Sequence, residues 1–308
     1  MSLENFRLKV FRTVAEKRSF RLAAESLLLT QPAVTLQIKA LEEELGVQLF
    51  DRAGQNIALT AAGQLLREYA ERLAAIAAEA QSQIGELTGE QQGELRIAAS
   101  TTIAQYVLPT LVGDFLALHP RVRPGILTGN TDMVVQRVAE NAVDVGLVEG
   151  PAMRRDLKIE PFLSDQLMLI VPPRHPFAGR TQIQASDLAE QPLILREKGS
   201  GTRRIIEREL RRFGLSPKRM KIALELDSTE AIKLAVEAGL GVGFVPLRAT
   251  HKELKLGTLR QVAVDGLSLV RDFSLVYRRR PEPNGLPQVF LTFLRGVKGR
   301  DKSQKRDK

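Results

Sequence analysis

The stretch from Ser19 to Gly46, SFRLAAESLLLTQPAVTLQIKALEEELG, constrains the fold most because it marks both ends of two short helices. Ser19 and Thr30 are N-cap residues, whose hydroxyls can accept the free N–H groups of a first helical turn. Pro32 suits the first turn of the second helix, and Gly46 suits a left-handed stop after it. The pattern predicts two helices joined by a tight turn, either a DNA-binding helix-turn-helix or an ordinary helical hairpin.

The second helix of this pair has one apolar face and one polar face. Its apolar residues recur three and four apart, as a buried stripe requires, at Val34, Ile38, Leu41 and Leu45. Gln31, Thr35 and Lys39 share another face near the start of the helix. Amide and hydroxyl groups can hydrogen-bond to base edges in the major groove, and a lysine can neutralise phosphate. This face has the groups that a recognition helix needs, while an ordinary helical hairpin in a small core is an equal alternative on this segment alone.

The flanking segments complete a small domain. Before the pair, a helical stripe predicts a supporting helix that closes a three-helix core, with the members Leu3, Phe6, Val10, Phe11 and Val14. After Gly46, VQLFDRAGQNIALT alternates apolar and polar residues around the turn AGQN, which predicts a two-stranded wing. Arg52 lies near the tip of this wing, where it can reach a phosphate or the minor groove, or can simply be solvated.

A long helix follows the wing. Thr60 can cap the proline-free run AAGQLLREYAERLAAIAAEAQSQIGEL. Its apolar residues alternate spacings of four and three, the seam of a coiled coil, at Ala62, Leu66, Tyr69, Leu73, Ile76, Ala80, Ile84 and Leu87. The helix can pair with a second chain or pack on its own chain. We favour pairing between chains, because two recognition helices must lie about 34 Å apart to read two half-sites.

The net charge of +9 does not by itself indicate DNA binding, because of where the charges lie. Residues 1–60 carry eight basic and seven acidic side chains, whereas residues 278–308 carry ten basic and three acidic. The DNA prediction therefore depends on the face of the recognition helix. The tail at 301–308 is expected to be basic and disordered, with non-specific attraction to DNA as the alternative.

Several classes of protein are disfavoured by the sequence. There is no cysteine, and His119, His175 and His251 are far apart, so no metal is expected. No apolar run approaches the ~18 residues of a membrane span and no signal peptide is visible, so we expect a cytoplasmic protein without a membrane partner. GLGVGF follows a helix and enters a strand, the reverse of a dinucleotide site, and no G-x-S-x-G or P-loop occurs. We expect neither a cofactor nor an enzyme.

From Gly93 onward, strands alternate with helices in two similar series, which predicts two α/β lobes. The chain is expected to cross between the lobes near residue 165 and to return near residue 268. Ligands of such folds bind beyond the carboxyl ends of strands, where helix N-termini suit a sulfate, a phosphate or a small carboxylate. These junctions are rich in hydroxyls: Ser100-Thr101-Thr102, Thr128-Gly129-Asn130-Thr131, Gly199-Ser200-Gly201-Thr202 and Asp227-Ser228-Thr229. Each one can equally be a plain helix cap.

Residues 3–63 resemble the winged helix-turn-helix of the LysR-type transcriptional regulators. The resemblance is carried by Phe11, Ser19-Phe20, Ala23-Ala24, Leu27, Gln31-Pro32-Ala33-Val34, Gln37-Ile38, Leu41-Glu42, Leu45-Gly46, Leu49-Phe50, Arg52, Leu59-Thr60 and Ala62-Gly63. The two lobes resemble the effector domain of the same family, which is built like a periplasmic solute-binding protein. REKGSGTR and GNTDMVVQRVAENAVDVGLVEG look most like regulators of sulfur assimilation or carbon fixation.

The resemblance implies an α/β fold class overall, with an N-terminal winged helix-turn-helix, a long linker helix and a two-lobed α/β effector domain. The expected domains are a DNA-binding domain at 1–60, a linker and dimerisation helix at 61–90, an effector-binding domain at 91–300 and the tail at 301–308. Lobe I is expected to comprise 91–164 and 268–300, and lobe II 165–267.

The resemblance also implies the site residues. The DNA-binding positions are Gln31, Pro32, Thr35, Gln37, Lys39 and Arg52. The effector-binding positions are Ser100, Thr102, Thr128, Asn130, Ser200 and Thr202, with Glu149 and Asp227 as secondary candidates that can limit attraction for an anion or bind an amine. Thr35 replaces the usual serine and keeps its hydroxyl. Leu36 replaces a frequent basic residue, which removes a phosphate contact and offers one to a thymine methyl.

We therefore expect a sequence-specific DNA-binding transcription regulator that responds to a small-molecule effector, a small anion or carboxylate bound between the lobes. The implied partners are double-stranded DNA, the effector, RNA polymerase and further copies of the chain in a homodimer or homotetramer. The alternatives are a cytoplasmic solute-binding protein, against which the missing signal peptide argues, and an enzyme acting in the cleft, for which no reaction is suggested.

Overall fold

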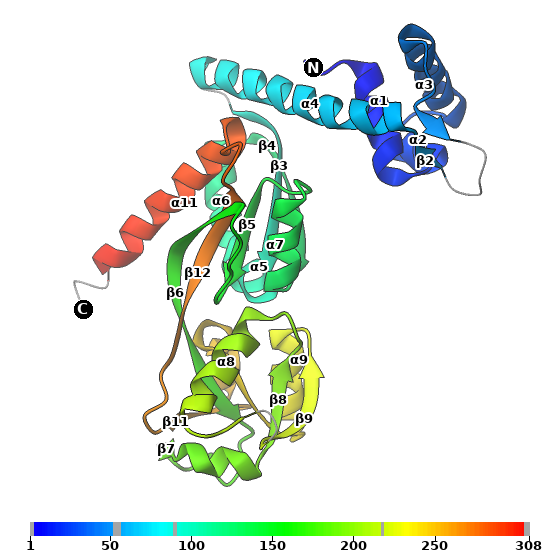
Figure 1. The fold of residues 1–308 in the computed structure, drawn as a ribbon. Helices are drawn as coiled ribbons and strands as arrows, with labels where there is room; N and C mark the ends of the chain where they lie inside the picture. The colour runs from blue at the N-terminus through cyan, green and yellow to red at the C-terminus, as the bar shows by residue number, and fades with distance from the viewer. Residues whose placement is uncertain (1–2, 52–56, 89–90, 217–218, 305–308) are drawn as a thin grey trace. The chain divides into compact units, whose positions relative to one another are not determined.

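The computed structural model describes residues 3–51, 57–88, 91–216 and 219–304 (Figure 1). The chain forms two compact units, Met1–Gly93 and Glu94–Lys308. The first contains a helical domain and a long helix, and the second is a two-lobed α/β domain. Among the described residues, no helix combines the length and apolar character needed to cross a membrane.

Three helices form the core of the first unit, and their ends follow the predicted signals. They are α1 (Phe6–Lys17), α2 (Phe20–Leu27) and α3 (Gln31–Leu45). The Ser19 hydroxyl accepts the N–H of Leu22 at 3.3 Å, and the Thr30 hydroxyl accepts that of Ala33 at 3.4 Å. Gly46 ends α3 with a φ of 67°. The helix-turn-helix predicted from these residues is confirmed.

The predicted apolar stripes are correct in their middle and wrong at their ends. Val10, Phe11 and Val14 are buried with the α3 stripe, whereas Leu3, Phe6 and Leu45 are between 46% and 59% exposed. Leu3 precedes the start of α1, so the helical period does not place it. Phe6 and Leu45 are the terminal residues of their helices, where the core has already ended.

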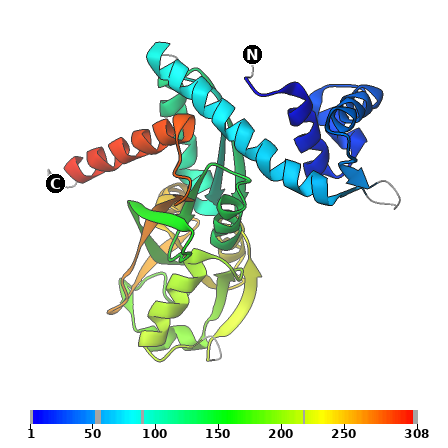
Figure 2. The same cartoon turned by 45° about the horizontal axis from the view of Figure 1, so that its top comes forward.

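The wing and the long helix follow. Strands β1 (Phe50–Asp51) and β2 (Ala58–Leu59) are antiparallel, and the Glu42 carboxylate accepts the N–H of Leu49 at 2.9 Å, which anchors the first strand to α3. Helix α4 (Ala61–Thr88) is uninterrupted (Figure 2), and the Thr60 hydroxyl accepts the N–H of Gly63 at 3.0 Å. The predicted Arg52 lies outside the described residues.

The apolar seam of α4 divides into two parts. Its first members, Ala62 and Leu66, pack against the core of the helical domain, together with Ala70 from outside the predicted seam. Tyr69, Leu73 and Ile76 are instead between 50% and 59% exposed in the single chain. The first turns of α4 thus pack on their own chain, while its middle keeps an apolar surface.

The second unit contains one branched sheet. Its main path runs β4-β3-β5-β12-β6-β10-β8-β9, and β11 pairs with both β6 and β7. The strands are β3 (Gln92–Ser100), β4 (Arg121–Gly129), β5 (Val145–Glu149), β6 (Leu157–Val171), β7 (Gln182–Ile183), β8 (Pro192–Arg196), β9 (Lys221–Leu226), β10 (Val242–Pro246), β11 (Arg260–Val264) and β12 (Leu269–Arg278). The predicted fold class is confirmed.

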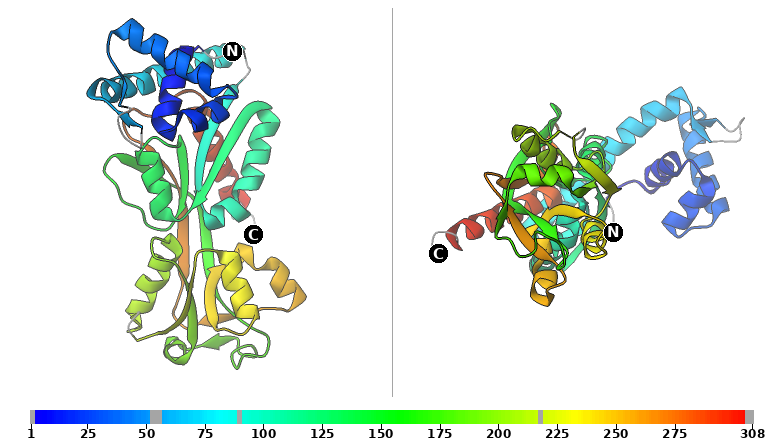
Figure 3. Two further views of the ribbon diagram at one scale, coloured as in Figure 1. Left: turned by 90° about the vertical axis from the view of Figure 1, so that its right-hand side faces the viewer. Right: turned by 90° about the horizontal axis from the view of Figure 1, so that it is seen from below.

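Strands β6 and β12 connect the lobes by running antiparallel through both of them (Figure 3). Phe162 and Phe273 belong to the hydrophobic core of lobe I, and Leu167 and Leu269 belong to that of lobe II. Each strand therefore passes from one core to the other within a few residues.

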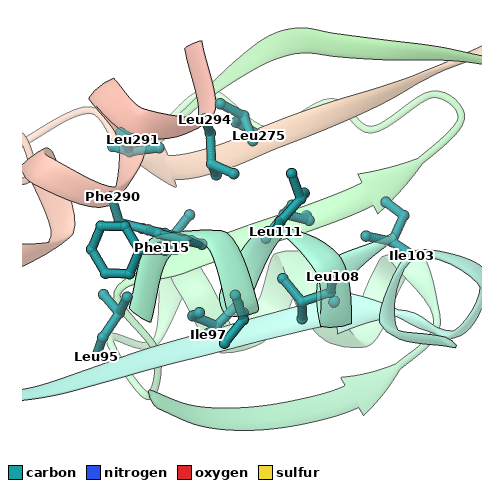
Figure 4. Packing of buried hydrophobic residues seen from close by; sticks show 14 of the residues in the cluster. Leu95, Ile97, Ile103, Leu108, Leu111, Phe115, Leu275, Phe290, Leu291 and Leu294 are labelled. Atoms are coloured by element: carbon teal, nitrogen blue, oxygen red, sulfur yellow. The ribbon is translucent and has the colours of Figure 1, made fainter. Parts of the chain in front are cut away.

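Helices cover both faces of each lobe. In lobe I, α6 (Leu108–Leu118) and α11 (Gly285–Gln304) pack on one face through Phe115 and Phe290, as Figure 4 shows, and α7 (Thr131–Ala139) covers the other. In lobe II, α8 (Gly201–Arg212) and α9 (Thr229–Glu237) lie on opposite faces. Strands covered on both faces are mostly apolar, and every residue of β5 and β10 is buried, including Glu149 at the end of β5.

Some elements differ from the sequence prediction. Helix α11 continues to Gln304, into the tail expected to be disordered, because its lysines, arginine and glutamine are good helix formers. Residues 305–308 lie outside the described part of the chain. Strand β6 already begins at Leu157, and the short elements β7, β11 and α10 (His251–Leu256) were not predicted.

The backbones of the two lobes approach each other closely at Gly201. A Cβ atom there would lie 1.6 Å from the backbone oxygen of Glu149 and 2.7 Å from the Thr131 hydroxyl. Gly201 starts α8 in lobe II, whereas Glu149 and Thr131 belong to lobe I. Only a residue without a side chain allows this approach.

We predict that Gly201→Ala lowers the free energy of unfolding by about 1–3 kcal/mol, because the new methyl group forces backbone of the two lobes apart. Urea unfolding followed by circular dichroism measures the change. Gly113→Ala is the control, because Gly113 lies within α6 and a Cβ atom added there would meet no neighbour within 4 Å among the described residues. This control should stabilise by about 0.5–1 kcal/mol. Equal effects of the two substitutions would contradict the close lobe contact.

Candidate functional site

The polar face of α3 carries the predicted DNA-reading residues. Val34, Ile38 and Leu41 fix the helix to the core, which turns the opposite face outward. Gln31, Pro32 and Lys39 are exposed and Thr35 is half-buried. The Thr35 hydroxyl donates to the Gln31 carbonyl at 3.0 Å, and its oxygen remains able to accept a further hydrogen bond.

These side chains share one open hollow of about 450 Å³, lined by Gln31, Pro32, Thr35, Leu36 and Lys39. Leu36 is 64% exposed within this otherwise polar surface. Gln37 is half-buried and does not line the hollow. The structure thus brings together four of the six predicted DNA-binding residues, adds Leu36, and places Gln37 beside them.

The predicted effector residues are mostly buried where the lobes meet. Ser100, Thr102, Ser200 and Thr202 are each at most 2% exposed. The Thr102 hydroxyl lies 3.3 Å from that of Thr229 in the other lobe, and the Ser200 hydroxyl caps α8 by accepting the N–H of Arg203. The lobes are therefore closed on this group of hydroxyls. The Ser100 hydroxyl has no hydrogen-bond partner within the described residues.

The remaining candidates lie further out. Asn130 caps α7 by accepting the N–H of Met133 at 3.0 Å, and its side chain lies beside Gly199 of lobe II. Thr128 is exposed on β4, and Asp227 is exposed before α9. Neither Thr128 nor Asp227 belongs to the buried group.

A buried ionic network joins the lobes beside these hydroxyls. Arg271 of β12 lies 2.7 Å from Glu149, 2.7 Å from Asp165 and 2.5 Å from the Thr202 hydroxyl. Arg196 of β8 lies 3.3 Å from the Thr101 hydroxyl and 3.8 Å from Glu149. All four charged side chains are almost completely buried. Buried charges require partners, and here the partners come from both lobes.

Arg196 and Arg271 carry the positive charges of this site, and neither was among the residues predicted from the sequence. Both lie in strands, where a charge between apolar neighbours signals a buried functional group or a solvent-facing edge. LILRE and SLVRD both carried that signal. Arg203 and Arg204, in the first turn of α8, are paired with Glu225 at 2.9 Å and with Asp132 at 2.7 Å.

A second contact between the lobes surrounds Lys233 of α9. Its ammonium group is 2.7 Å from Glu253, 2.8 Å from Glu230 and 5.6 Å from the ring centre of Tyr106 in lobe I. Burial by itself would lower the pKa of Lys233, but the two carboxylates outweigh burial and raise it. Burial would likewise raise the pKa of Glu253, but the hydrogen bond from Lys233 lowers it.

An open hollow of about 390 Å³ adjoins the crossing strands on residues that the sequence analysis did not select. Asp165 and Arg248, 2.8 Å apart, form part of its lining together with His251 and Val270. Both charges are already paired with each other, so this hollow offers no charge that lacks a counter-ion among the described residues.

A polar reading face on a helix-turn-helix, followed by a two-lobed domain with a buried polar site, defines a ligand-responsive DNA-binding regulator. Comparison with protein families agrees: residues 6–64 match the bacterial regulatory helix-turn-helix protein of the lysR family, and residues 88–298 match the LysR substrate binding domain. The chain belongs to the LysR family of transcription regulators. This assignment confirms the family predicted from the sequence and replaces the solute-binding-protein and enzyme alternatives.

Individual relatives are similar over most of their length. The HTH-type transcriptional regulator CysL of Bacillus subtilis is 34% identical over 94% of this chain and 95% of its own. A probable RuBisCO transcriptional regulator of Cyanidioschyzon merolae is 38% identical over 86% and 88%. The regulatory domain of Synechocystis PCC6803 CcmR, solved in complex with 2-PG, is 30% identical, covers 67% of this chain and 98% of that one, and superposes with a TM-score of 0.62.

We predict that Glu253→Gln lowers the free energy of unfolding at pH 7 by about 1–2 kcal/mol, because Lys233 loses one of its two carboxylates while buried. The folded pKa of Glu253 is lowered, so its stabilisation is present above its unfolded pKa and is lost as the pH falls through the folded pKa. The difference from wild type should stay constant down to about pH 5 and shrink below about pH 4.5. Urea unfolding across this range measures it.

Glu190→Gln is the matched control, because Glu190 pairs with Lys221 at 2.8 Å on the exposed surface of the same lobe. Exposed pairs contribute little, so this substitution should leave the free energy of unfolding nearly unchanged. A pH-independent cost for Glu253→Gln would contradict the ion pair as its cause.

Proposed function

We propose that this regulator senses a small anion or carboxylate bound where its two lobes meet, and that effector binding changes its affinity for DNA. The observation that carries the proposal is the burial of Ser100, Thr102, Ser200 and Thr202 together with Arg196, since hydroxyls and a guanidinium are typical partners of an oxyanion. Thr128 and Asn130 are proposed as outer contacts. The 2-PG bound by the CcmR domain is itself an anion, which supports this class of effector.

For DNA, we propose that Gln31, Pro32, Thr35, Gln37 and Lys39 contact the operator in the major groove, with Arg52 on the adjacent backbone or minor groove. The exposed hollow on α3 supports this assignment, because its amide and hydroxyl groups can contact bases while its ammonium group contacts phosphate. Leu36 is placed to contact a thymine methyl.

We further propose that the chain works as a homodimer or homotetramer on an inverted repeat, with α4 helices paired through Tyr69, Leu73 and Ile76. Their exposure on a helix with a coiled-coil spacing supports pairing between copies. We also propose RNA polymerase as the partner through which bound DNA is regulated. Because its target is DNA, we propose the cytoplasm as its site of action.

The DNA assignment predicts that Gln31→Ala combined with Thr35→Ala lowers affinity for a DNA fragment selected by the wild-type protein about 10- to 100-fold, because base contacts are worth ~1–3 kcal/mol. Fluorescence anisotropy at one fixed salt concentration measures affinity for this fragment and for a scrambled one. Lys39→Ala should instead weaken binding to both fragments similarly. Unchanged discrimination in the double variant would refute α3 as the reading helix.

The effector assignment predicts that one anion selectively raises the unfolding temperature of the full chain. The panel to be tested contains sulfate, sulfite, thiosulfate, phosphate, 2-PG, sugar phosphates, small carboxylates and O-acetylserine. At a hundred times its dissociation constant, a ligand stabilises by ~2.7 kcal/mol. Ser200→Ala with Thr202→Ala should remove the shift. The control Thr110→Ala with Ser186→Ala changes two exposed hydroxyls and should keep it. The absence of a shift with every anion would rule out this effector class and leave the DNA assignment standing.

A further inference from the structure

Arg196 is a buried arginine that does not use all of its hydrogen-bond donors. The residue is 1% exposed. Its Nε donates to Glu197 at 2.8 Å, and its Nη2 donates to Glu197 at 3.2 Å and to the Thr101 hydroxyl at 3.3 Å. Its Nη1 has no hydrogen-bond partner in the described part of the chain. An unsatisfied charged donor in the interior is costly, so this group is prepared for an acceptor.

The acid that pairs with this donor is Glu149 of lobe I. Its Oε1 lies 3.8 Å from Arg196 Nη1, within ion-pair distance but too far for a hydrogen bond. Its Oε2 lies 2.7 Å from Arg271 Nη1. Glu149 thus forms a close ion pair with Arg271 and only a loose one with Arg196.

The charges of the network already balance without a ligand. Arg271 also pairs with Asp165, and Arg196 also pairs with Glu197. An anion that entered beside Arg196 would therefore meet Glu149 as a competing negative charge. Because Glu149 approaches Arg196 only to 3.8 Å, an anion with better geometry can replace it beside that arginine.

We propose that Glu149 is an internal counter-anion, which occupies the place of the effector's anionic group beside Arg196 until the effector arrives. The inference builds on the proposed function, in which the effector is an anion bound at the lobe boundary. The incoming oxyanion accepts from Arg196 Nη1 and from the Ser100 hydroxyl, which is 0% exposed and equally without a partner in the described structure. Two unused buried donors would be satisfied at once.

This competition would also link binding to lobe arrangement. Glu149 is covalently part of lobe I, whereas Arg196 is part of lobe II, so their attraction ties the lobes together. A free anion bound to Arg196 breaks the attraction between Glu149 and Arg196 and replaces it with the anion's own contacts. The effector then has a different affinity for the two arrangements, which is the requirement for shifting between them.

Glu149→Gln tests the proposal, because it removes the charge while keeping the size of the side chain and one of its two acceptor oxygens. Isothermal titration of the full chain with sodium sulfate, sodium phosphate and 2-PG should show at least about ten-fold tighter binding of one anion than in wild type, since a like charge within a few ångströms is gone. Glu149→Asp, which withdraws the carboxylate by one methylene, should give a smaller gain and serves if the glutamine variant folds poorly.

Two further variants locate the effect. Glu149→Gln combined with Arg196→Gln keeps the charge of the network balanced and should lose the gain. Glu160→Gln is the matched control, because Glu160 also pairs with an arginine, Arg295 at 3.0 Å, but lies away from the lobe boundary, and anion binding should stay within about two-fold of wild type.

The outcomes separate this inference from the proposed function. An anion that binds wild type and Glu149→Gln equally, or binds the variant more weakly, overturns the counter-anion and leaves the effector site standing. A gain that survives loss of Arg196 also overturns the inference, because the anion would then bind elsewhere. No anion binding by any variant overturns the counter-anion and the anionic effector together. Binding by Glu149→Gln alone supports a counter-anion that outcompetes the tested anions in wild type.

Discussion

The antiparallel pairing of β6 with β12 is the constraint on which the two-lobed unit depends. Both strands leave one hydrophobic core and enter the other, so their register fixes what lies at the boundary. In that register Arg271 is directly opposite Asp165, and the two side chains form an ion pair at 2.7 Å. The pairing of these two strands thus places a buried charge where the chain crosses between its lobes, and in the described structure the chain crosses only through β6 and β12.

Once Arg271 is buried there, the remaining polar contacts at the boundary follow from the need to satisfy it. A guanidinium in the interior requires acceptors on several sides, and Arg271 takes Asp165 from the neighbouring strand, Glu149 from lobe I and the Thr202 hydroxyl from lobe II. The position of one lobe relative to the other therefore decides whether these charges remain paired. A ligand that alters these ion pairs therefore acts directly on the relative position of the lobes. No series of contacts through the hydrophobic core is needed.

How much the sequence could predict depended on the range of the interaction. The caps at Ser19 and Thr30 involve residues three positions away, so they were predictable from local sequence, as were the hydroxyls at strand ends. The pairing of Arg271 with Asp165 joins residues 106 positions apart and requires the register of two strands. Leu28 adopts a φ of 56° in the turn of the helix-turn-helix, a conformation that a sequence pattern would assign to glycine.

The distribution of charge also bears on how such a protein distinguishes its operator from other DNA. Residues 1–60 carry a net charge of +1, while most of the excess lies near the C-terminus. One helix-turn-helix domain therefore has little general attraction for phosphate, and in the proposed DNA assignment its affinity depends on the few groups on α3. Weak single domains become effective only when two are linked, since the second then binds at a high effective concentration. In the proposed dimer the exposed apolar middle of α4 would provide that link, so that low charge in the DNA-binding domain and pairing through α4 would together give specificity.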